Sequence, residues 1–229
     1  MTQVVDLVTE TPFFTSDTHF WHDAMIRIGL RQFATVQEMN ETLIARWNAV
    51  VPPTATVFHL GDVSFAGTVD TLEVLGQLNG RIILIRGNHD KKLPVAVRQR
   101  FTSIHDLLEI DVKEGGGTKQ RITLLHYAMR VWNRHHYGAW HLHGHSHGSL
   151  VPTGRSMDVG VDVHDLAPIS YGEVKEELVS RAVHIVDHHA TPLEAENKVL
   201  RRLALCACGD GFTEGEPGIC VNCATVSNT

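Results

Sequence analysis

The sequence predicts an α/β protein with a mostly parallel sheet that is covered by helices. The prediction rests on short apolar strands that alternate with amphipathic helices through the first 90 residues, and on polar residues that follow these strands directly. The chain has 229 residues, which suits one domain of roughly 190 residues and a short appendix. We therefore expect one domain at 1–190, followed at 191–229 by a helix and a small cysteine-containing tail.

The first half of the chain alternates strands with helices. Thr35–Glu38 is a capping box, and Pro52 stops the helix that it opens. Gly80 follows the next helix, where a glycine commonly ends a helix. The expected elements are a strand at 13–14, a helix at 35–49, a strand at 56–60, a helix at 69–78 and a strand at 81–85.

The second half of the chain has a different pattern. Gly115–Gly117 is typical of a hairpin turn, so the strands on either side should be antiparallel. Ser170–Glu173 is a second capping box, and it should open a helix that runs toward residue 186. Thr191–Pro192 favours the start of another helix, because proline is tolerated in the first turn. Further strands are expected at 122–125, 140–143 and 157–163.

Composition excludes several classes of protein. Hydrophobic residues make up 43% and charged residues 20%, so the chain is not mainly disordered. The net charge of −6 gives no extended basic surface for nucleic acid or anionic membrane. We find neither a signal peptide nor an apolar stretch near the roughly 18–20 residues that span a bilayer. All four cysteines lie in the last 24 residues, which favours a reducing cytoplasm over a disulfide framework.

Residues with metal-binding side chains follow the predicted strands. Ligands of open α/β sheets bind outside the carboxyl ends of the strands, so these side chains should converge at one edge. Carboxylates, an amide and imidazoles together suit Mn²⁺, iron or Zn²⁺ better than Mg²⁺ or Ca²⁺, which prefer oxygen ligands. The residues are Asp17, His19, Asp62, Asn88, His89, His126, His145 and His147.

Five short motifs carry these residues, in the order Asp17-Thr-His19, Gly61-Asp62, Gly87-Asn88-His89-Asp90, His126 and Gly144-His145-Ser-His147. They resemble the five signature blocks of the calcineurin-like metallophosphoesterases, and most of all those of the small phosphoesterases of bacteria and their phages. The intervals of about 45, 26, 38 and 19 residues place each block at its own strand end. The resemblance covers roughly residues 10 to 186. It implies a four-layer αββα sandwich of two mixed sheets flanked by helices.

The resemblance also implies two divalent metal ions. We expect Mn²⁺, with iron, Zn²⁺ and Ni²⁺ as alternatives. A hydroxide that bridges the two ions would attack the phosphorus atom, because two cations stabilise hydroxide far below the pKa of bulk water. By resemblance, the first ion would be bound by Asp17, His19 and His147, the second by Asn88, His126 and His145, and both by Asp62.

Further residues receive roles beside the metal ligands. By resemblance, His89 would protonate the leaving alkoxide, and Asp90 would orient its ring and raise its pKa. Arg86 and His22 are candidates for binding the substrate phosphate. His59 and His143 are expected to be structural, whereas Asp158 and Asp162 should support the ligands or lie in turns.

The four cysteines form two close pairs. Thiolates from two turns can close around one ion, so the tail is a candidate structural zinc site. The first pair has only one intervening residue, which is tighter than usual, so free or oxidised thiols remain the alternative. The pairs are Cys206 with Cys208 and Cys220 with Cys223.

The sequence therefore predicts a metal-dependent phosphoesterase, with a phosphodiesterase acting on nucleotides or cyclic nucleotides as the first hypothesis. The alternative within enzymes is a phosphomonoesterase that acts on small phosphates or phosphoproteins. A non-catalytic scaffold is a third hypothesis, and the presence of every expected ligand and of His89 argues against it. The expected partner is a small phosphate ester, without a membrane or an extended nucleic-acid surface.

Overall fold

The computed structural model describes residues 2–6, 11–114 and 117–185. The compact unit that contains all of them except residue 185 spans Met1–His184. The expected second region at 191–229, with its four cysteines, lies outside the described residues. No helix among the described residues has both the length and the apolar character that crossing a bilayer requires.

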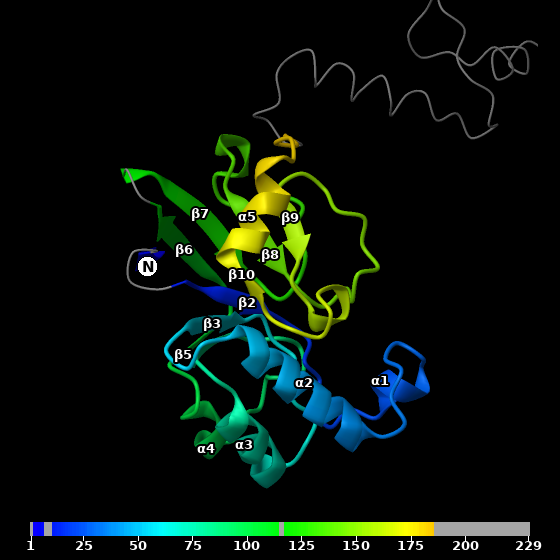
Figure 1. Cartoon of the computed structure of the whole chain (residues 1–229). Coiled ribbons are helices and arrows are strands. Elements are labelled where there is room, and N and C mark those ends of the chain that lie inside the picture. The colour runs from blue at the N-terminus through cyan, green and yellow to red at the C-terminus, as the bar shows by residue number, and fades with distance from the viewer. Residues whose placement is uncertain (1, 7–10, 115–116, 186–229) are drawn as a thin grey trace, which may run out of the picture. The chain divides into compact units, whose positions relative to one another are not determined.

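Two five-stranded sheets form the centre of the molecule, and both are mixed, which confirms the predicted fold class (Figure 1). The first sheet has the order β10-β2-β3-β4-β5, and all its pairings are parallel except that of β10 with β2. Its strands are β2 (Phe13–Thr15), β3 (Thr56–His59), β4 (Arg81–Ile85), β5 (Ser103–His105) and β10 (Ile169–Ser170).

The second sheet has the order β1-β6-β7-β8-β9. Strands β6 and β7 are antiparallel on either side of the predicted hairpin turn, as expected, and the other pairings are parallel. The strands are β1 (Thr2–Asp6), β6 (Leu108–Lys113), β7 (Lys119–Leu124), β8 (Trp140–His143) and β9 (Ser156–Asp158).

The strand expected at 157–163 is shorter than predicted. Strand β9 ends at Asp158, and a 3-10 helix follows at Val161–Val163. The Asp158 carboxylate accepts a hydrogen bond from the Gly160 backbone N–H at 2.8 Å, which turns the chain. The Val161 N–H then donates to the Ser16 carbonyl, so the segment joins the loop after β2 instead of continuing the strand.

Of the described helices, the three that were predicted begin within one residue of the expected positions, whereas two short helices were not predicted. The side chain of Thr35 accepts a hydrogen bond from the Glu38 N–H, and Ser170 and Glu173 form a complete capping box. The last helix ends at Val179 and not near residue 186, because Arg181 reaches back to the Ser156 carbonyl at 2.7 Å. The predicted helices are α2 (Val36–Val50), α3 (Thr68–Gln77) and α5 (Tyr171–Val179), and the short ones are α1 (Ala24–Arg27) and α4 (Val95–Arg98).

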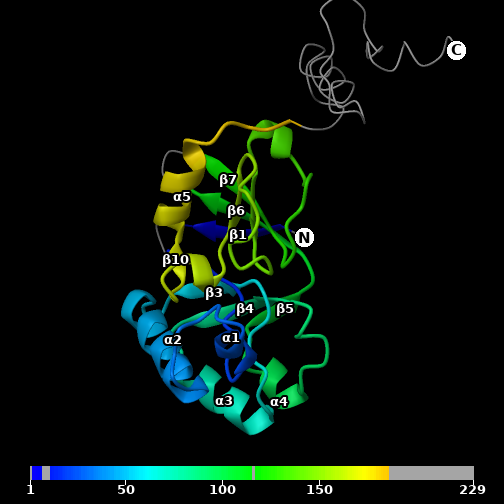
Figure 2. The ribbon, with the colours of Figure 1, turned by 90° about the vertical axis from the view of Figure 1, so that its right-hand side faces the viewer.

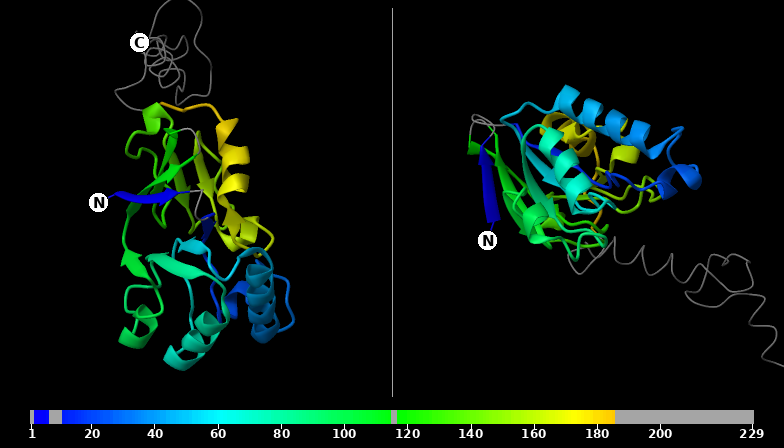
Figure 3. Two further views of the ribbon diagram at one scale, coloured as in Figure 1. Left: turned by 60° about the vertical axis from the view of Figure 1, so that its left-hand side comes forward. Right: turned by 90° about the horizontal axis from the view of Figure 1, so that it is seen from below.

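The first sheet is buried on both faces. Successive side chains along its strands point to opposite faces, so they belong to two separate parts of the core. Ile83 and Ile85 belong to a core cluster that contains residues of both sheets and of α5, whereas Ile82 and Leu84 join one formed with α2, α3 and α4. Figures 2 and 3 show α2, α3 and α4 on one face of the first sheet and the second sheet on the other. Strands buried on both faces account for the continuous apolar run at 82–85.

Two histidines, His59 and His141, are held neutral by burial. The Gly61 N–H points at Nδ1 of His59, and the Met129 N–H points at Nε2 of His141, so each of these ring nitrogens accepts and carries no proton. Burial lowers the pKa of His59 to about 3 and that of His141 to about 4. His59 is thus structural in this fold, as expected.

We predict that His141 makes the protein less stable in mild acid. Below the unfolded pKa of about 6.5, the unfolded chain binds a proton at this residue and the folded chain does not. The free energy of unfolding should therefore fall by up to about 1.4 kcal/mol per pH unit from this residue. The free energy of unfolding can be measured in urea at pH 7.5 and at pH 5.5, with chelator present, for wild type and for His141→Gln. Its decrease from pH 7.5 to pH 5.5 should be smaller by about 1 kcal/mol in the variant. Equal losses would contradict this account of His141.

Candidate metal centre

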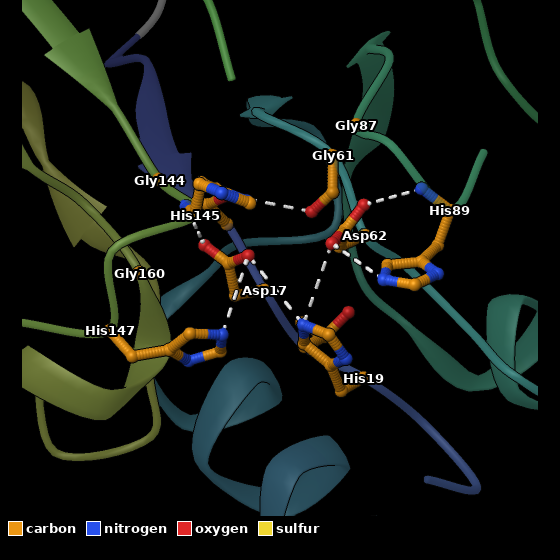
Figure 4. Close-up of polar contacts among 12 residues, drawn as sticks. Asp17, His19, Gly61, Asp62, Gly87, His89, Gly144, His145, His147 and Gly160 are labelled. Carbon is orange, nitrogen blue, oxygen red and sulfur yellow. Dashed lines mark hydrogen bonds and ion pairs between the residues drawn. The ribbon is translucent and has the colours of Figure 1, made fainter. Parts of the chain in front are cut away.

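Five strands that each have a parallel neighbour are followed by loops, and these loops converge at one edge of the two sheets (Figure 4). Backbone hydrogen bonds continue from strand to strand into these loops, as when Asp17 N–H donates to the Gly61 carbonyl and His19 N–H to the Asp62 carbonyl. The structure thereby brings together all the residues that the sequence predicted for this edge. Asp17 and His19 follow β2, Asp62 follows β3, Asn88 and His89 follow β4, His126 follows β7, and His145 and His147 follow β8.

Glycines make this close approach of loops feasible. A Cβ at Gly87 would lie 2.1 Å from Oδ1 of Asp62, and a Cβ at Gly144 would lie 2.4 Å from Oδ2 of Asp17. A Cβ at Gly61 would meet the Gly87 nitrogen at 2.3 Å, and the φ of Gly61 is +96°. A side chain at Gly87 or Gly144 would push a carboxylate out of place, and one at Gly61 would displace the backbone at Gly87.

Each of the two buried carboxylates is fixed through one oxygen. Oδ2 of Asp17 accepts the His145 N–H at 2.8 Å, and Oδ1 of Asp62 accepts the His89 N–H at 2.9 Å. The other oxygen of each carboxylate faces imidazole nitrogens. Burial opposes ionisation of Asp17, but the neighbouring His19 ring, the Ser16 hydroxyl and the imidazoles of His126 and His147 outweigh it, so the pKa of Asp17 falls to about 2 and the residue is a carboxylate at neutral pH.

The ligand atoms fall into two groups, Asp17 with His19 and His147, and Asp62 with His126 and His145. Within each group these atoms all lie within 4.8 Å of one another. His19 Nε2 is 3.6 Å from Asp17 Oδ1 and 3.7 Å from Asp62 Oδ2, so this ring links the two groups. Asp62 Oδ2 is also 3.6 Å from His126 Nε2, which places the Asp62 carboxylate between both sets of imidazoles.

These separations suit ligands of a cation and not hydrogen bonds. A contact of 3.6 Å is too long for a hydrogen bond, whereas two atoms bound to one ion at about 2.0–2.2 Å lie roughly 3–4 Å apart. Oδ1 of Asp17 and Nε2 of His19 are both buried and have no hydrogen-bond partner within the described part of the chain. Buried polar atoms of this kind are rare in folded proteins, and two of them face each other here.

His126 gives the sharpest indication that this centre suits a cation. Its Nδ1 lies 2.7 Å from the Leu60 carbonyl, which can only accept, so Nδ1 carries the proton. In the neutral ring Nε2 is then an acceptor, yet it lies 2.9 Å from Oδ1 of Asn88, which is an acceptor as well. Two acceptors at this distance repel each other unless a positive charge lies beside them. A metal ion bound by Asn88, His126 and Asp62 supplies that charge, so these residues fit the expected metal.

Two further histidines, His19 and His147, direct Nε2 toward the metal centre because a neighbouring side chain contacts their Nδ1. Nδ1 of His147 donates to Oδ2 of Asp162 at 2.6 Å, and Nδ1 of His19 is 3.0 Å from Nδ1 of His22. A second ring nitrogen bonded in this way fixes the tautomer and the ring orientation of a ligating histidine. Asp162 therefore supports the predicted ligand His147, as expected from the sequence.

Arg31 was not predicted from the sequence, although it holds part of the site together. It is 3% exposed, and it contacts Asp162 through Nε at 2.7 Å and Nη2 at 3.0 Å. The same guanidinium donates to the carbonyls of Asp17 and Thr18, so it joins the loop after β2 to the 3-10 helix at Val161–Val163. Arg31 and Asp162 are 131 residues apart in sequence, and no local pattern predicts their contact.

Five of the seven proposed ligands have left-handed backbone conformations, with φ between +47° and +66°. Asparagine, aspartate and histidine enter this region more readily than other residues with a side chain, but each such position costs on the order of 1–3 kcal/mol. Strained positions of this type cluster at functional sites. The five residues are Asp17, His19, Asp62, His145 and His147.

Asp90 has partners other than those expected. Its carboxylate accepts the backbone N–H groups of Asp62 at 2.7 Å, Gly87 at 2.8 Å and Val63 at 3.2 Å. Among the described contacts, these backbone groups and not the His89 ring occupy both carboxylate oxygens. Asp90 thus joins the loops after β3 and β4 in this structure, and its action on the His89 ring stays a prediction. The His89 ring instead lies beside Phe65, with ring centres 4.4 Å apart.

The two residues expected to bind phosphate are engaged elsewhere. Arg86 pairs with Asp106, with Nη1 and Oδ1 2.5 Å apart at the surface, and this pair would have to open before Arg86 could reach a phosphate. His22 contacts His19 and stacks on Phe65, with ring centres 3.6 Å apart. His22 is thus a support of His19 in this structure, and its contact with a phosphate stays a prediction.

The chain resembles several known proteins. A family model described as calcineurin-like phosphoesterase matches residues 13–212. An uncharacterized protein, MJ1445, from Methanocaldococcus jannaschii is 34% identical over 167 residues, covering 69% of this chain and 85% of its own length. The Gene 66 protein of Mycobacterium phage L5 is 30% identical over 179 residues, covering 66% of this chain and 86% of the phage protein.

Among solved structures, the AQ665 protein of unknown function from Aquifex aeolicus superposes with a TM-score of 0.57 at 26% identity. The match covers 73% of this chain and 99% of that chain. It agrees with the arrangement of two mixed sheets described above.

We predict that Asp162→Asn weakens metal binding, because His147 loses the carboxylate that fixes its ring. Loss of such a partner typically costs 10–100-fold in metal affinity, measurable by calorimetric titration with Mn²⁺. Asp165→Asn is the matched control, since its side chain is exposed and lies outside the ligand groups. Unchanged affinity in Asp162→Asn would show that His147 is not held by this contact.

Proposed function

The chain belongs to the calcineurin-like phosphoesterase family, and from this premise we propose that it hydrolyses phosphodiesters of nucleotides or cyclic nucleotides with two divalent metal ions. The observation that carries the proposal is the pair of ligand groups that meet at Asp62. Its Oδ2 lies 3.6–3.7 Å from ring nitrogens of both groups, so one carboxylate can serve two ions. We propose Mn²⁺ for both positions, because mixed oxygen and nitrogen ligands suit it.

Two bound cations would lower the pKa of water to supply the nucleophile, and would offset the charge that develops on the phosphate oxygens. The protein residues position these groups. Asp17, His19 and His147 would hold one ion, and Asn88, His126 and His145 the other. Because Asp17 and Asp62 are each anchored by a backbone N–H, their free oxygens keep a fixed direction. This rigidity is what phosphoryl transfer requires of a protein, since positioning and electrostatics supply most of the catalysis.

His89 is the proposed general acid. Its side chain is 45% exposed at the rim of the centre, and its Nε2 is 3.8 Å from Asp62 Oδ2. Its backbone N–H, bonded to Asp62, ties its position to that of the bridging carboxylate. A histidine held there can donate a proton to the oxygen of a departing alkoxide while the metal ligands stay in place.

A diester is favoured over a monoester by the charges around the site. A monoester brings nearly two negative charges, whereas a diester brings one. Two arginines beside the centre are already neutralised, Arg31 by Asp162 and Arg86 by Asp106. A phosphomonoesterase remains the second candidate, and it would need the exposed Arg86–Asp106 pair to open. A scaffold without activity is not supported, because every proposed ligand is in place.

We predict two Mn²⁺ ions per chain and a strong loss of both in Asp62→Asn. The amide keeps the size of the side chain and the bond from His89 N–H but removes the shared negative charge. Activity should fall at least a hundredfold, and Mn²⁺ should be counted by electron paramagnetic resonance, because thiolates in the tail favour Zn²⁺. Asp70→Asn, on the exposed side of α3, serves as the control. Two ions and near-normal turnover in Asp62→Asn would exclude a bridging role.

We also predict that the loss of activity in His89→Ala depends on the leaving group of the substrate. General acid catalysis contributes roughly 10²–10⁴-fold where the leaving group needs a proton. A nucleoside alkoxide needs one and a nitrophenolate does not, so the variant should lose far more activity on a dinucleotide than on bis-4-nitrophenyl phosphate. His184→Ala, which lies outside the site, should match wild type on both. Equal losses would make His89 a phosphate-binding group, and loss of a metal ion would make it a ligand.

A further inference from the structure

A cavity of about 270 Å³ opens on the side of His89. Its lining includes Phe65 and Ala66 from the loop after β3, Lys92 from the loop after β4, Val97 of α4 and Phe101. None of the seven proposed metal ligands contributes to this lining, although His89 does. The cavity therefore begins where the metal centre ends, with His89 belonging to both.

Phe65 forms the boundary between the cavity and the metal centre. Its ring centre lies 3.6 Å from that of His22, 4.4 Å from that of His89 and 5.1 Å from that of His19. The ring is thus packed between a supporting histidine and the proposed acid, while it remains 36% exposed. A group that passes His89 on its way out of the metal centre meets the Phe65 side chain.

The cavity has a buried apolar floor, and polar side chains such as Thr68, His89 and Lys92 contribute much of its accessible lining. Val63, Val97 and Phe101 are 2%, 1% and 6% exposed. The hydroxyls of Ser64 and Thr71 also line the cavity, but they bond to each other at 3.0 Å, and Ser64 accepts the Ala66 N–H at 3.2 Å. An apolar floor combined with polar lining groups, among them the exposed Lys92, suits a flat ring that has apolar faces and polar edges. The volume admits one ring system and not a long polymer.

A general acid must lie within hydrogen-bond reach of the oxygen that it protonates. The leaving group therefore extends from the phosphorus atom past His89, and the cavity lined by His89 is the space that receives it. Resting on the function proposed above, we infer that this cavity binds the leaving alcohol of the substrate, and that it selects alcohols carrying an aromatic or heterocyclic ring, as a nucleoside does. Phe65, Ala66 and Val97 are then residues that determine specificity.

The test fills the cavity without altering any residue of the metal centre. Ala66→Trp places a large side chain in the lining, and Thr68→Trp does so from an exposed lining position if the first variant fails to fold. Val69→Trp is the matched control, because Val69 is 76% exposed and does not line the cavity. The Mn²⁺-loaded full chain is given two methyl phosphodiesters, one with 4-nitrophenol and one with trifluoroethanol as the leaving group.

The filled variants should raise KM for the nitrophenyl ester at least tenfold and leave the trifluoroethyl ester within threefold of wild type. Val69→Trp should change neither. Independently of activity, saturation-transfer NMR with adenosine should show binding to wild type and to Val69→Trp, and a loss of binding in the filled variants.

Other outcomes separate the two proposals. If the filled variants keep wild-type KM for both esters, or lose both esters equally while still binding Mn²⁺, the cavity is not the leaving-group site and the proposed hydrolysis stands. If wild type hydrolyses neither ester at saturating Mn²⁺, the proposed function itself is overturned, and the assignment of the cavity to a leaving group falls with it.

Discussion

The constraint on which the site depends is the burial of two carboxylates, Asp17 and Asp62, at neighbouring strand ends. They are 0% and 2% exposed, and both face the same imidazole nitrogen of His19. Two negative charges buried this close are unfavourable without a compensating positive charge. The fold holds them together through backbone N–H donors, and it leaves one oxygen of each directed at a common centre. Cations bound between these oxygens are the simplest way to compensate the two buried negative charges.

The surrounding structure follows from the need to keep these oxygens in place. Glycines at 61, 87 and 144 let the loops approach, Asp90 joins two of them through backbone N–H groups, and Arg31 joins two more through Asp162. The left-handed residues at the same loops are strained, and the dense hydrogen bonding supports them. A rigid centre of this kind favours reactions in which little covalent chemistry is required of the protein.

Chemistry and selectivity come from different parts of the fold. The proposed ligands follow parallel strands whose ends are fixed by the sheets, whereas the cavity beside His89 is built from loops and from residues of the helices α3 and α4. Loops vary more readily than strand ends without loss of the core. A family of enzymes can therefore retain one metal centre and change the alcohol that it releases, and His89 stands at the boundary between the two parts.

The sequence by itself determined the alternation of strands and helices, the capping boxes of α2 and α5, and the placement of the expected ligands after strand ends. These features are local, since they depend on periodicity and on residues within about four positions. Only the tertiary structure decided which nitrogen of His126 and His147 faces the centre, because the Leu60 carbonyl and Asp162 that set it lie 66 and 15 residues away. It also decided that Asp90 binds backbone groups, that Arg86 pairs with Asp106, and that Arg31 reaches Asp162. Such contacts depend on how distant segments pack, and a one-dimensional pattern does not encode that packing.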